Sequence, residues 1–316
     1  MLLGVTKLRF QTTGGLAREL ETIDSWSQGH PVEALLPPIH RPEDFFSEES
    51  ARHTILELGS AVGDLGTGLK ILDIGAGIGR TSVFLASKGH EVSALEPSGE
   101  QCRILDFVAQ TLRLPIRIFE GTAEVSDQIA ESDFDLCIFN ASLHHCDDPI
   151  LALAGCKTLL KKTGRVILLE EPVLKPFRSK GWYLRRLRED PQSMGHYGGN
   201  EHVYYSWEYP RMLRAAGFAN VRATPAALLK DLRQSLIAIA KARTQHGYVY
   251  SESKLIQHFS WNALMNRLLK RKSLAFMLAK ASLIPLNFEG AASGSHRSTA
   301  YCPTACSHTK PPSDPA

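Results

Sequence analysis

The segment Leu-Asp-Ile-Gly-Ala-Gly-Ile-Gly-Arg, at residues 72–80, constrains the fold of this chain more than any other feature. It overlaps a short apolar run, residues 70–74, which is typical of a buried strand that ends at a glycine turn. Residues 79–88 then predict a helix. The first backbone N–H groups of a helix have no partner within the helix and point toward the preceding turn. A strand, a glycine turn and a helix in this order therefore predict a binding site for a nucleotide-like ligand.

A carboxylate follows at the end of the next predicted strand, where residues 91–95 are followed by Glu96. In dinucleotide-binding folds an acid at this point accepts hydrogen bonds from the two ribose hydroxyls. The dinucleotide fingerprint G-x-G-x-x-G/A needs a small third residue. Counting from Gly75 and Gly77, that position is Arg80, so the spacing disfavours NAD. Taken alone, the loop is also compatible with an ordinary α/β turn that binds nothing.

Strand-like and helix-like runs alternate from Ser50 to about Ala223. The predicted strands cover residues 70–74, 91–95, 116–120, 133–140, 164–170 and 219–223. The predicted helices cover residues 80–88, 100–112, 150–161 and 207–216. This alternation implies an α/β fold with a doubly wound, mostly parallel sheet and helices on both faces. Ligands of such sheets bind at the carboxyl ends of the strands.

The pattern Asp73-x-Gly75-x-Gly77-x-Gly79 resembles the first motif of the class I methyltransferases that use S-adenosylmethionine (SAM). The resemblance implies a Rossmann-like methyltransferase fold with SAM as cofactor. It also implies that the three glycines let the backbone lie against SAM. Asp73 would lie near the amino-acid end of SAM, and Glu96 would hold its ribose. SAM carries no phosphate, so no Walker lysine is needed.

Later motifs extend this resemblance over roughly residues 50–223. Residues 133–145, Asp-Phe-Asp-Leu-Cys-Ile-Phe-Asn-Ala-Ser-Leu-His-His, are similar to the fourth-strand region of the branch that methylates small molecules such as quinones and glycans. Residues 159–171 resemble the turn and fifth strand, and residues 209–221 resemble the closing helix, Ala-Gly-Phe and strand. The resemblance adds Asn140 to the expected cofactor-binding residues.

Two departures from the family pattern affect the expected site. After the third strand the family often carries Gly-Asp-Ala-Glu, but residues 121–124 are Gly-Thr-Ala-Glu. We expect Thr122 to accept one hydrogen bond and the backbone of Ala123 to contact the adenine. The family's last antiparallel strand is not predicted. Residues 287–290 resemble its lead-in, but residues 291–296 are too small and polar for a buried strand.

His144 and His145 directly follow the fourth predicted strand and are the candidate catalytic residues. Methyl transfer from a sulfonium is an in-line displacement, which an enzyme promotes mainly by aligning the reactants. A hydroxyl acceptor also needs a base, and histidine suits that role near neutral pH. A carbon acceptor that is already acidic needs less help. Alternatively, one or both histidines only hydrogen-bond the loop backbone.

Residues 172–206 form an insert between the fifth strand and the next helix, and we expect them to build the acceptor pocket. Aromatic faces stack on sugars or planar rings, and arginines bind phosphate or carboxylate. The alternative is a helical excursion whose aromatic side chains pack on the core. The candidate substrate-binding residues are Arg185, Tyr197, His202, Tyr204 and Tyr205.

The chain divides into four expected parts. Residues 1–49, with four prolines, are predicted to be irregular and to act in part as a lid. Residues 50–225 form the SAM-binding domain, residues 226–290 a basic C-terminal helical extension and residues 291–316 a disordered tail. Within the extension, residues 254–284 are interpreted as amphipathic helix packed on the core. Contact with an anionic membrane surface or an acidic substrate is the alternative.

The rest of the composition indicates a cytoplasmic protein, at most peripheral to a membrane. No apolar run is long enough to span a bilayer, and the first fifteen residues lack a signal-peptide core. We expect reduced cysteines. We expect no metal site, since Cys302, Cys306 and His308 lie in a Pro/Ser/Thr-rich tail where their proximity is attributed to chance.

These features predict transfer of a methyl group from SAM to a small-molecule, sugar or lipid-linked acceptor, at oxygen or carbon. A catalytically inactive SAM-binding module is one alternative, because Thr122 departs from the family pattern. An NAD-dependent oxidoreductase is a less favoured alternative, because Arg80 stands where the dinucleotide fingerprint needs a small residue. Nucleic acid is not an expected partner, since residues 140–143 are not the Asn/Asp-Pro-Pro-aromatic run of enzymes that flip bases. The oligomeric state is left open.

Overall fold

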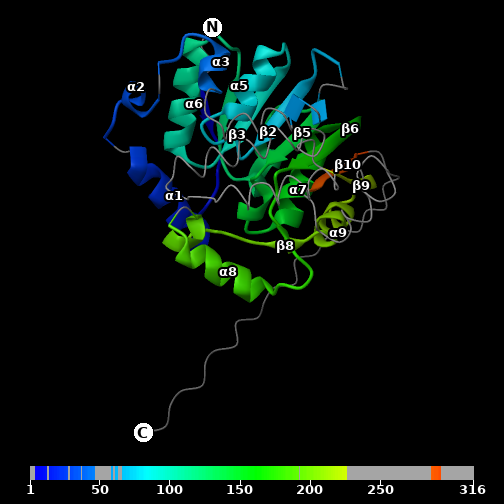
Figure 1. The fold of residues 1–316 in the computed structure, drawn as a ribbon. Helices are drawn as coiled ribbons and strands as arrows, with labels where there is room; N and C mark the ends of the chain where they lie inside the picture. Colours follow the sequence, from blue (N-terminus) through cyan, green and yellow to red (C-terminus); the bar gives the residue numbers. More distant parts are fainter. Residues whose placement is uncertain are drawn as a thin grey trace, which may run out of the picture.

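The computed structural model describes residues 4–12, 14–27, 29–36, 38–46, 58–59, 61–62, 66–191, 193–225 and 286–292. Its centre is an eight-stranded sheet with the strand order β1-β4-β3-β2-β5-β6-β10-β9 (Figure 1). The strands are β1 (Val5–Lys7), β2 (Lys70–Ile74), β3 (Glu91–Glu96), β4 (Arg117–Glu120), β5 (Phe134–Asn140), β6 (Leu160–Leu169), β9 (Ala219–Pro225) and β10 (Leu286–Ala291).

The pairing of neighbouring strands confirms the predicted mostly parallel sheet. All pairs from β1 to β6 are parallel. Only β10 runs antiparallel to its neighbours, β6 on one side and β9 on the other. The strand order reverses between β2 and β5, so the loops after these strands diverge. Ligands of open α/β sheets bind at such a reversal point.

The helices cover both faces of the sheet, as a doubly wound fold requires. The α-helices are α1 (Gly14–Ser27), α2 (Val32–Leu35), α3 (Pro42–Phe45), α5 (Arg80–Ser87), α6 (Gly99–Thr111), α7 (Pro149–Leu159), α8 (Lys180–Glu189) and α9 (Glu208–Ala215). Short 3-10 helices are η2 (Ala123–Gln128), η3 (Leu143–His145) and η4 (Met194–Tyr197). Two short strands, β7 (Val173–Leu174) and β8 (Tyr204–Tyr205), pair outside the main sheet.

Alternating side chains of the central strands divide the core into two layers. Ile71 of β2 packs with α5 and α6, whereas Leu72 and Ile74 pack with α7 and α9. This division follows from the strand period of two residues, which sends successive side chains to opposite faces. Because both faces are covered, the fully buried positions of β2 and β5 are mainly apolar. The buried Asp73 is an exception, and it lies at the carboxyl end of β2.

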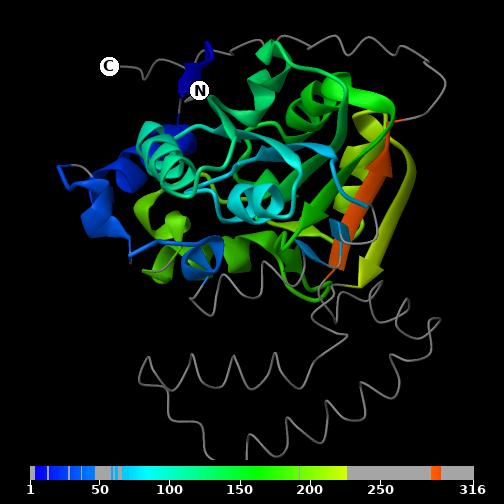
Figure 2. The same cartoon turned by 90° about the horizontal axis from the view of Figure 1, so that it is seen from above.

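The sequence left open whether the last strand of the sheet is present, and the structure contains it. β10 (Leu286–Ala291) lies between β6 and β9, in orange beside the yellow β9 in Figure 2. Phe288 is fully buried and stacks on Tyr209 with ring centroids 4.7 Å apart. A Cβ on Gly290 would lie 2.8 Å from Cβ of Phe218. Gly290, part of the lead-in recognised in the sequence, is therefore small where β10 passes close to Phe218. β10 begins within residues 226–290, the segment predicted as a helical extension.

The N-terminal segment, predicted to be irregular, is instead largely folded onto the domain. β1 extends the sheet by pairing with β4, and α1 packs against α6 and η4. Figure 1 shows α1 and α8 next to each other at the same end of the molecule. The expectation of an irregular segment was wrong. A strand of three residues, such as β1, gives almost no pattern in the sequence, because it forms by pairing with the edge of β4.

Several predictions concern residues outside the described part of the chain. The basic helices, the membrane-contacting stretch 254–284 and the tail with Cys302, Cys306 and His308 are among them. In the part that the structure describes, none of the helices combines the length and apolarity that crossing a bilayer requires.

Candidate functional site

The glycine loop, residues 75–79, connects β2 to α5 at the carboxyl edge of the sheet. Gly75 and Gly79 both have positive φ, +72° and +93°. A Cβ on Gly75 would collide with Ser142, and one on Gly79 would collide with Leu105. Both positions therefore need glycine for conformation and for close packing. Gly75 and Gly77 line the cavity described below. Gly79 does not line it, and its lack of a side chain lets the start of α5 pack against Leu105 of α6.

Glu96 closes β3 and fixes the glycine loop from the side. Its Oε2 accepts a hydrogen bond from the backbone N of Gly77 at 2.8 Å, and its Oε1 accepts one from the backbone N of Ser98 at 2.9 Å. The residue is 4% exposed, and burial raises the pKa of the Glu96 carboxyl to about 7. A carboxylate held in this way keeps lone pairs for further donors, such as vicinal hydroxyls.

Asp73 lies beneath the glycine loop and is 1% exposed. Its Oδ2 accepts a hydrogen bond from Oγ of Ser82 at 2.6 Å, but its buried Oδ1 has no partner among the described residues. Burial raises the pKa of Asp73 to about 7. Asn140 also has one side-chain atom bonded and one without a partner. Its Nδ2 donates to Oγ1 of Thr81 at 3.0 Å, and its buried Oδ1 has no partner among the described residues. Neither residue lines the cavity directly.

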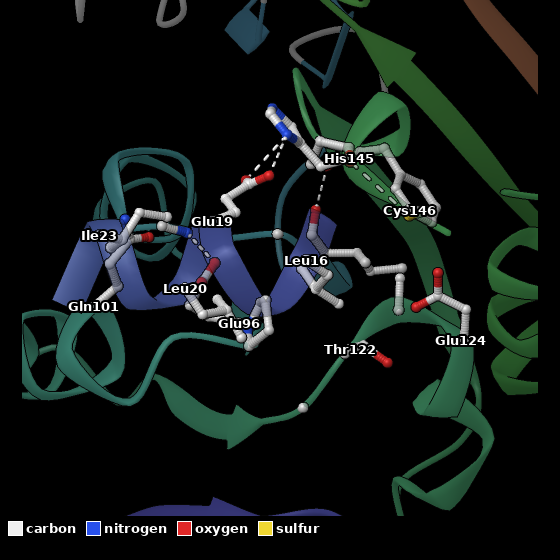
Figure 3. A pocket seen from close by; sticks show the side chains of 18 of the residues that line it. Leu16, Glu19, Leu20, Ile23, Glu96, Gln101, Thr122, Glu124, His145 and Cys146 are labelled. Carbon is white, nitrogen blue, oxygen red and sulfur yellow. Dashed lines mark hydrogen bonds and ion pairs between the residues drawn. The ribbon is translucent and has the colours of Figure 1, made fainter. Parts of the chain in front are cut away.

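A cavity lies above the glycine loop at the carboxyl ends of β2 to β5 (Figure 3). Thr122 and Ala123 line it, together with Gly121 and Glu124 from the loop after β4. The outer wall comes from the N-terminal helix. The side chains that α1 contributes are Leu16, Glu19, Leu20 and Ile23, and the insert contributes Met194.

The structure separates the roles of the two adjacent histidines, because His145 lines the cavity and His144 does not. Nδ1 of His144 lies 2.9 Å from Oε2 of Glu171. The Glu171 carboxylate also accepts backbone hydrogen bonds from Ser142, Leu143 and His144 at 3.0, 2.8 and 3.1 Å. Glu171 therefore fixes the whole loop after β5, and His144 is part of that arrangement.

His145 faces the N-terminal helix across the cavity. Its Nδ1 lies 3.0 Å from Oε1 of Glu19 and 3.1 Å from the backbone O of Asn200. Figure 3 shows the Glu19 side chain pointing to the His145 ring. Burial lowers the pKa of His145, but the hydrogen bond and charge of Glu19, with the charges of Glu201 and Glu171, raise it above its usual value on balance.

None of the five predicted substrate-binding residues lines the cavity. Arg185 is exposed on α8. The hydroxyl of Tyr197 donates to the backbone O of Pro191 at 3.2 Å. Tyr204 packs edge-on against Tyr209, with ring centroids 5.5 Å apart.

The other two of these residues also make contacts within the insert. Tyr205 stacks on Trp207 at 4.4 Å, and its hydroxyl donates to the backbone O of Arg178 at 2.9 Å. The backbone N of His202 donates to the backbone O of His144 at 3.0 Å, so His202 lies beside the histidine pair. The structure thus places His202 beside the histidine pair. The three tyrosines and Arg185 lie outside the cavity lining.

Sequence reasoning missed four residues of the site: Glu19, Gln101, Met194 and Asn200. The backbone N of Asn200 donates to Oε2 of Glu19 at 2.9 Å, and its Nδ2 donates to the backbone O of His145 at 2.6 Å. Glu19 thus joins the insert to the loop after β5. An acid on an amphipathic helix carries no local signal of such a role, because only the tertiary packing of α1 brings it to His145.

Comparison with known proteins gives a consistent identity for the domain. Residues 72–168 match the family model described as a methyltransferase domain. The chain is 30% identical over 126 residues to the uncharacterized methyltransferase YcgJ of Bacillus subtilis, covering 38% of this chain and 48% of YcgJ. It is 31% identical over 100 residues to a ubiquinone biosynthesis O-methyltransferase of Paraburkholderia phymatum, covering 32% and 43% of the two chains. The chain spans about half the length of the curated relatives it matches.

Solved structures of methyltransferases are also similar. The crystal structure of YcgJ from Bacillus subtilis matches with a TM-score of 0.45 at 20% identity, covering 62% of this chain and 90% of YcgJ. Phosphoethanolamine N-methyltransferase 2 of Haemonchus contortus, in complex with SAM, matches with a TM-score of 0.49 at 15% identity, covering 75% and 52%. From the family match, the glycine loop and the strand order, residues 72–168 form a methyltransferase domain of the SAM-dependent type.

Proposed function

We propose that this protein transfers the methyl group of SAM to a small-molecule acceptor, at oxygen or carbon. The observation that carries the proposal is a single cavity lined by Gly75, Gly77 and Glu96 at one part and by His145 at another. The glycine loop, the Glu96 carboxylate and an imidazole thus share one cavity (Figure 3). Such a combination of an apolar pocket with a few polar groups is typical of a catalytic site.

The residues present fit SAM as the cofactor. Glu96 would accept hydrogen bonds from the ribose hydroxyls, and the backbone of Gly75 and Gly77 would lie against the ligand. The buried Oδ1 of Asp73 has no partner among the described residues, which suits a ligand that carries an ammonium group or brings a bridging water. Thr122 and Ala123 line the part of the cavity expected to hold the adenine. When bound, SAM supplies an electrophilic methyl group on a positively charged sulfur.

His145 is the side chain that we propose to act on the acceptor. Its Nδ1 faces the Glu19 carboxylate and the Asn200 carbonyl, which both only accept hydrogen bonds. In the neutral imidazole the proton therefore stays on Nδ1, and Nε2 is free to receive a proton from a hydroxyl acceptor. His144, held by Glu171, is proposed to be a positioning residue.

The acceptor is proposed to be enclosed by α1 and the insert. Leu16, Leu20 and Ile23 give the cavity an apolar wall, and Met194 closes it from the insert. This wall excludes water from the reacting groups, which strengthens their interactions. We keep Arg185, Tyr204 and Tyr205 as candidate contacts for the outer part of a sugar or lipid-linked acceptor.

The test is a methyl-transfer assay on the purified full chain, combined with SAM calorimetry. A panel of phenolic, sugar and lipid-linked hydroxyl compounds is supplied with SAM, and formation of S-adenosylhomocysteine is measured. We expect acceptor-dependent turnover that Glu96→Ala abolishes by weakening SAM binding and His145→Ala abolishes without weakening it. Lys162→Ala, at an exposed position on β6, is the control. Tight SAM binding with no turnover on any acceptor class would instead indicate an inactive SAM-binding module.

A further inference from the structure

Two imidazoles and a carboxylate converge beside the acceptor end of the cavity. His144, His145 and Glu201 each offer one nitrogen or oxygen atom, and these atoms all lie within 4.8 Å of one another. The histidines come from η3, and Glu201 comes from the insert just before β8. The side chains of His144 and Glu201 are 9% and 14% exposed. The side chain of His145 is 26% exposed, so this group is a partly buried cluster and not a set of surface acids.

The hydrogen bonding of His144 leaves a lone pair pointed at a carboxylate. Its Nδ1 lies 2.9 Å from Oε2 of Glu171, and a carboxylate can only accept, so Nδ1 carries the proton. The Nε2 atom then presents its lone pair, and it lies 3.9 Å from Oε2 of Glu201. Two acceptors that face each other at this distance form no hydrogen bond. A cation between them would satisfy both.

His145 is held from behind in the same manner. Its Nδ1 lies 3.0 Å from Oε1 of Glu19, so its other ring nitrogen would be the ligand in the proposed site. The two imidazole rings are close, with centroids 4.1 Å apart. Histidines that bind metals almost always donate their other ring N–H to a carboxylate, a carbonyl or a water, which fixes the ring and raises its basicity. Glu171 and Glu19 occupy those positions here.

The charges of the cluster do not balance among the described residues. The side chains of Glu19, Glu171 and Glu201 are 9%, 0% and 14% exposed. In the described part of the chain, no lysine or arginine pairs with any of the three, and the other partner of Glu201 is Oγ of Ser193 at 3.2 Å. Three carboxyl groups thus face two imidazoles in this cluster. Buried carboxylates without a cationic partner are costly, and a divalent cation would offset that cost.

We propose that His144, His145 and Glu201 bind a divalent transition-metal ion, with Zn²⁺ as the best-suited species. Imidazole nitrogens with a carboxylate favour zinc and its neighbours over magnesium or calcium. Zinc bonds of about 2.0–2.2 Å in tetrahedral geometry place ligand atoms roughly 3.4 Å apart. The 3.9 Å between His144 Nε2 and Glu201 Oε2 would therefore need to close by about half an ångström. Other pairs in the cluster, at up to 4.8 Å, would need to close by up to about 1.4 Å.

Three protein ligands leave one position open, as in catalytic zinc sites. Where the proposed function holds, an acceptor oxygen would fill that position, and the ion would lower the pKa of the acceptor hydroxyl. His145 would then act as a ligand and the hydroxyl proton would pass to water. Binding of the ion itself does not depend on methyl transfer, so the two proposals can fail separately.

The test measures metal binding by the tag-free full chain in the absence of SAM. Metal removed by a chelator is replaced with Zn²⁺ in calorimetry, or with Co²⁺, whose visible absorption reports its coordination. We expect about one equivalent of Zn²⁺ per chain, a loss of binding in His144→Ala and Glu201→Gln, and a 10–100-fold weaker affinity in Glu171→Gln. His196→Ala is the matched control, since this histidine lies on η4 and hydrogen-bonds the backbone of Arg188.

Circular dichroism shows whether each variant is folded. X-ray absorption at the zinc edge of the wild-type chain avoids variants altogether, and it should show two imidazoles, oxygen ligands and no sulfur. Absence of stoichiometric zinc, sulfur ligation, or equal affinity in His144→Ala, Glu201→Gln and His196→Ala would overturn the proposal. SAM binding and turnover, measured separately, report on the methyltransferase activity.

Discussion

Glu19 on α1 and His145 after β5 face each other, with Oε1 of the carboxylate 3.0 Å from Nδ1 of the imidazole. The contact joins a helix from the start of the chain to the loop at the centre of the sheet. Because Glu19 also accepts a hydrogen bond from the backbone of Asn200, the insert is tied to the same point. The N-terminal helix therefore lines one side of the cavity and also holds the insert in place through Glu19.

Replacing Glu19 should weaken the fold more than replacing its neighbour on the same helix. Glu19→Ala leaves the buried N–H of Asn200 without its acceptor, which should lower the free energy of unfolding by about 1–3 kcal/mol. Glu21→Ala, at an exposed position of α1, should change it by less than about 0.5 kcal/mol. Urea unfolding of both variants measures the difference, and equal effects would show that the Glu19 contacts add nothing to stability.

Glu96→Ala should weaken SAM binding at least about a hundredfold. Two hydrogen bonds from ribose hydroxyls to a carboxylate contribute about 1.5–3 kcal/mol each, and the glycine loop also loses its contact to Gly77. Glu91→Ala serves as control, because Glu91 lies at the opposite end of β3 and pairs with Arg117. Calorimetry with SAM should find the control unchanged. Unchanged affinity in Glu96→Ala, or tight binding of NAD by the parent chain, would contradict the cofactor assignment.

The stability of the ligand-free protein should fall as pH rises from about 4.5 toward 7. Burial raises the pKa of Glu96 from 4.5 to about 7 and that of Asp73 from 3.8 to about 7. The folded state therefore binds these protons more tightly than the unfolded state, and deprotonation costs stability across this range. SAM should reverse part of the trend, since its donors favour the ionised carboxylates. Thermal unfolding at pH 5 to 8, with and without SAM, measures both effects, and Glu96→Gln should flatten the ligand-free curve.

Patterns of neighbouring residues in the sequence predicted the strand, turn and helix around the glycine loop. The apolar run of β2 and the glycines that end it are adjacent in the sequence, so strand, turn and helix could be placed without knowledge of the rest. β10 could not be placed, because the small residues at its end are held by pairing with β6 and β9, which is tertiary information. The role of β1 likewise depends on the edge of β4 that it covers.

The candidate site divides in the same way. Glu96 and Thr122 lie at strand ends, and in a parallel sheet all such ends meet at one edge, so their convergence was predictable. Glu19 and Asn200 come from segments whose position over the sheet follows only from tertiary packing. The tyrosines of the insert were singled out for their residue type, and the structure shows that stacking on Trp207 and Tyr209 already uses their rings.

Substituting both Tyr204 and Tyr205 with alanine should raise the KM for the acceptor and leave SAM affinity nearly unchanged. Their rings hold the insert that carries Met194 and Asn200 against the domain, so their loss should loosen the acceptor wall. The free energy of unfolding should also fall, by about 1–3 kcal/mol. Tyr205→Phe keeps the stacking on Trp207 and should retain the parental KM. An equal loss of SAM affinity and turnover would instead place these residues in cofactor binding.

His145→Ala should lower kcat by about 10²–10⁴ while SAM affinity stays close to that of the parent. His145 lines the cavity, so its imidazole can act on the acceptor, whereas His144 is bound to Glu171 behind the wall. Steady-state rates of the chelator-treated and the Zn²⁺-loaded parent then distinguish the two roles of His145. A proton acceptor needs no metal, so the treated parent would stay active, whereas a ligand requires the ion for turnover. If His145 acts as a ligand, activity should return with Zn²⁺ in the parent but not in His144→Ala or His145→Ala. A rate within threefold of the parent in His145→Ala would remove this residue from the chemistry under either role.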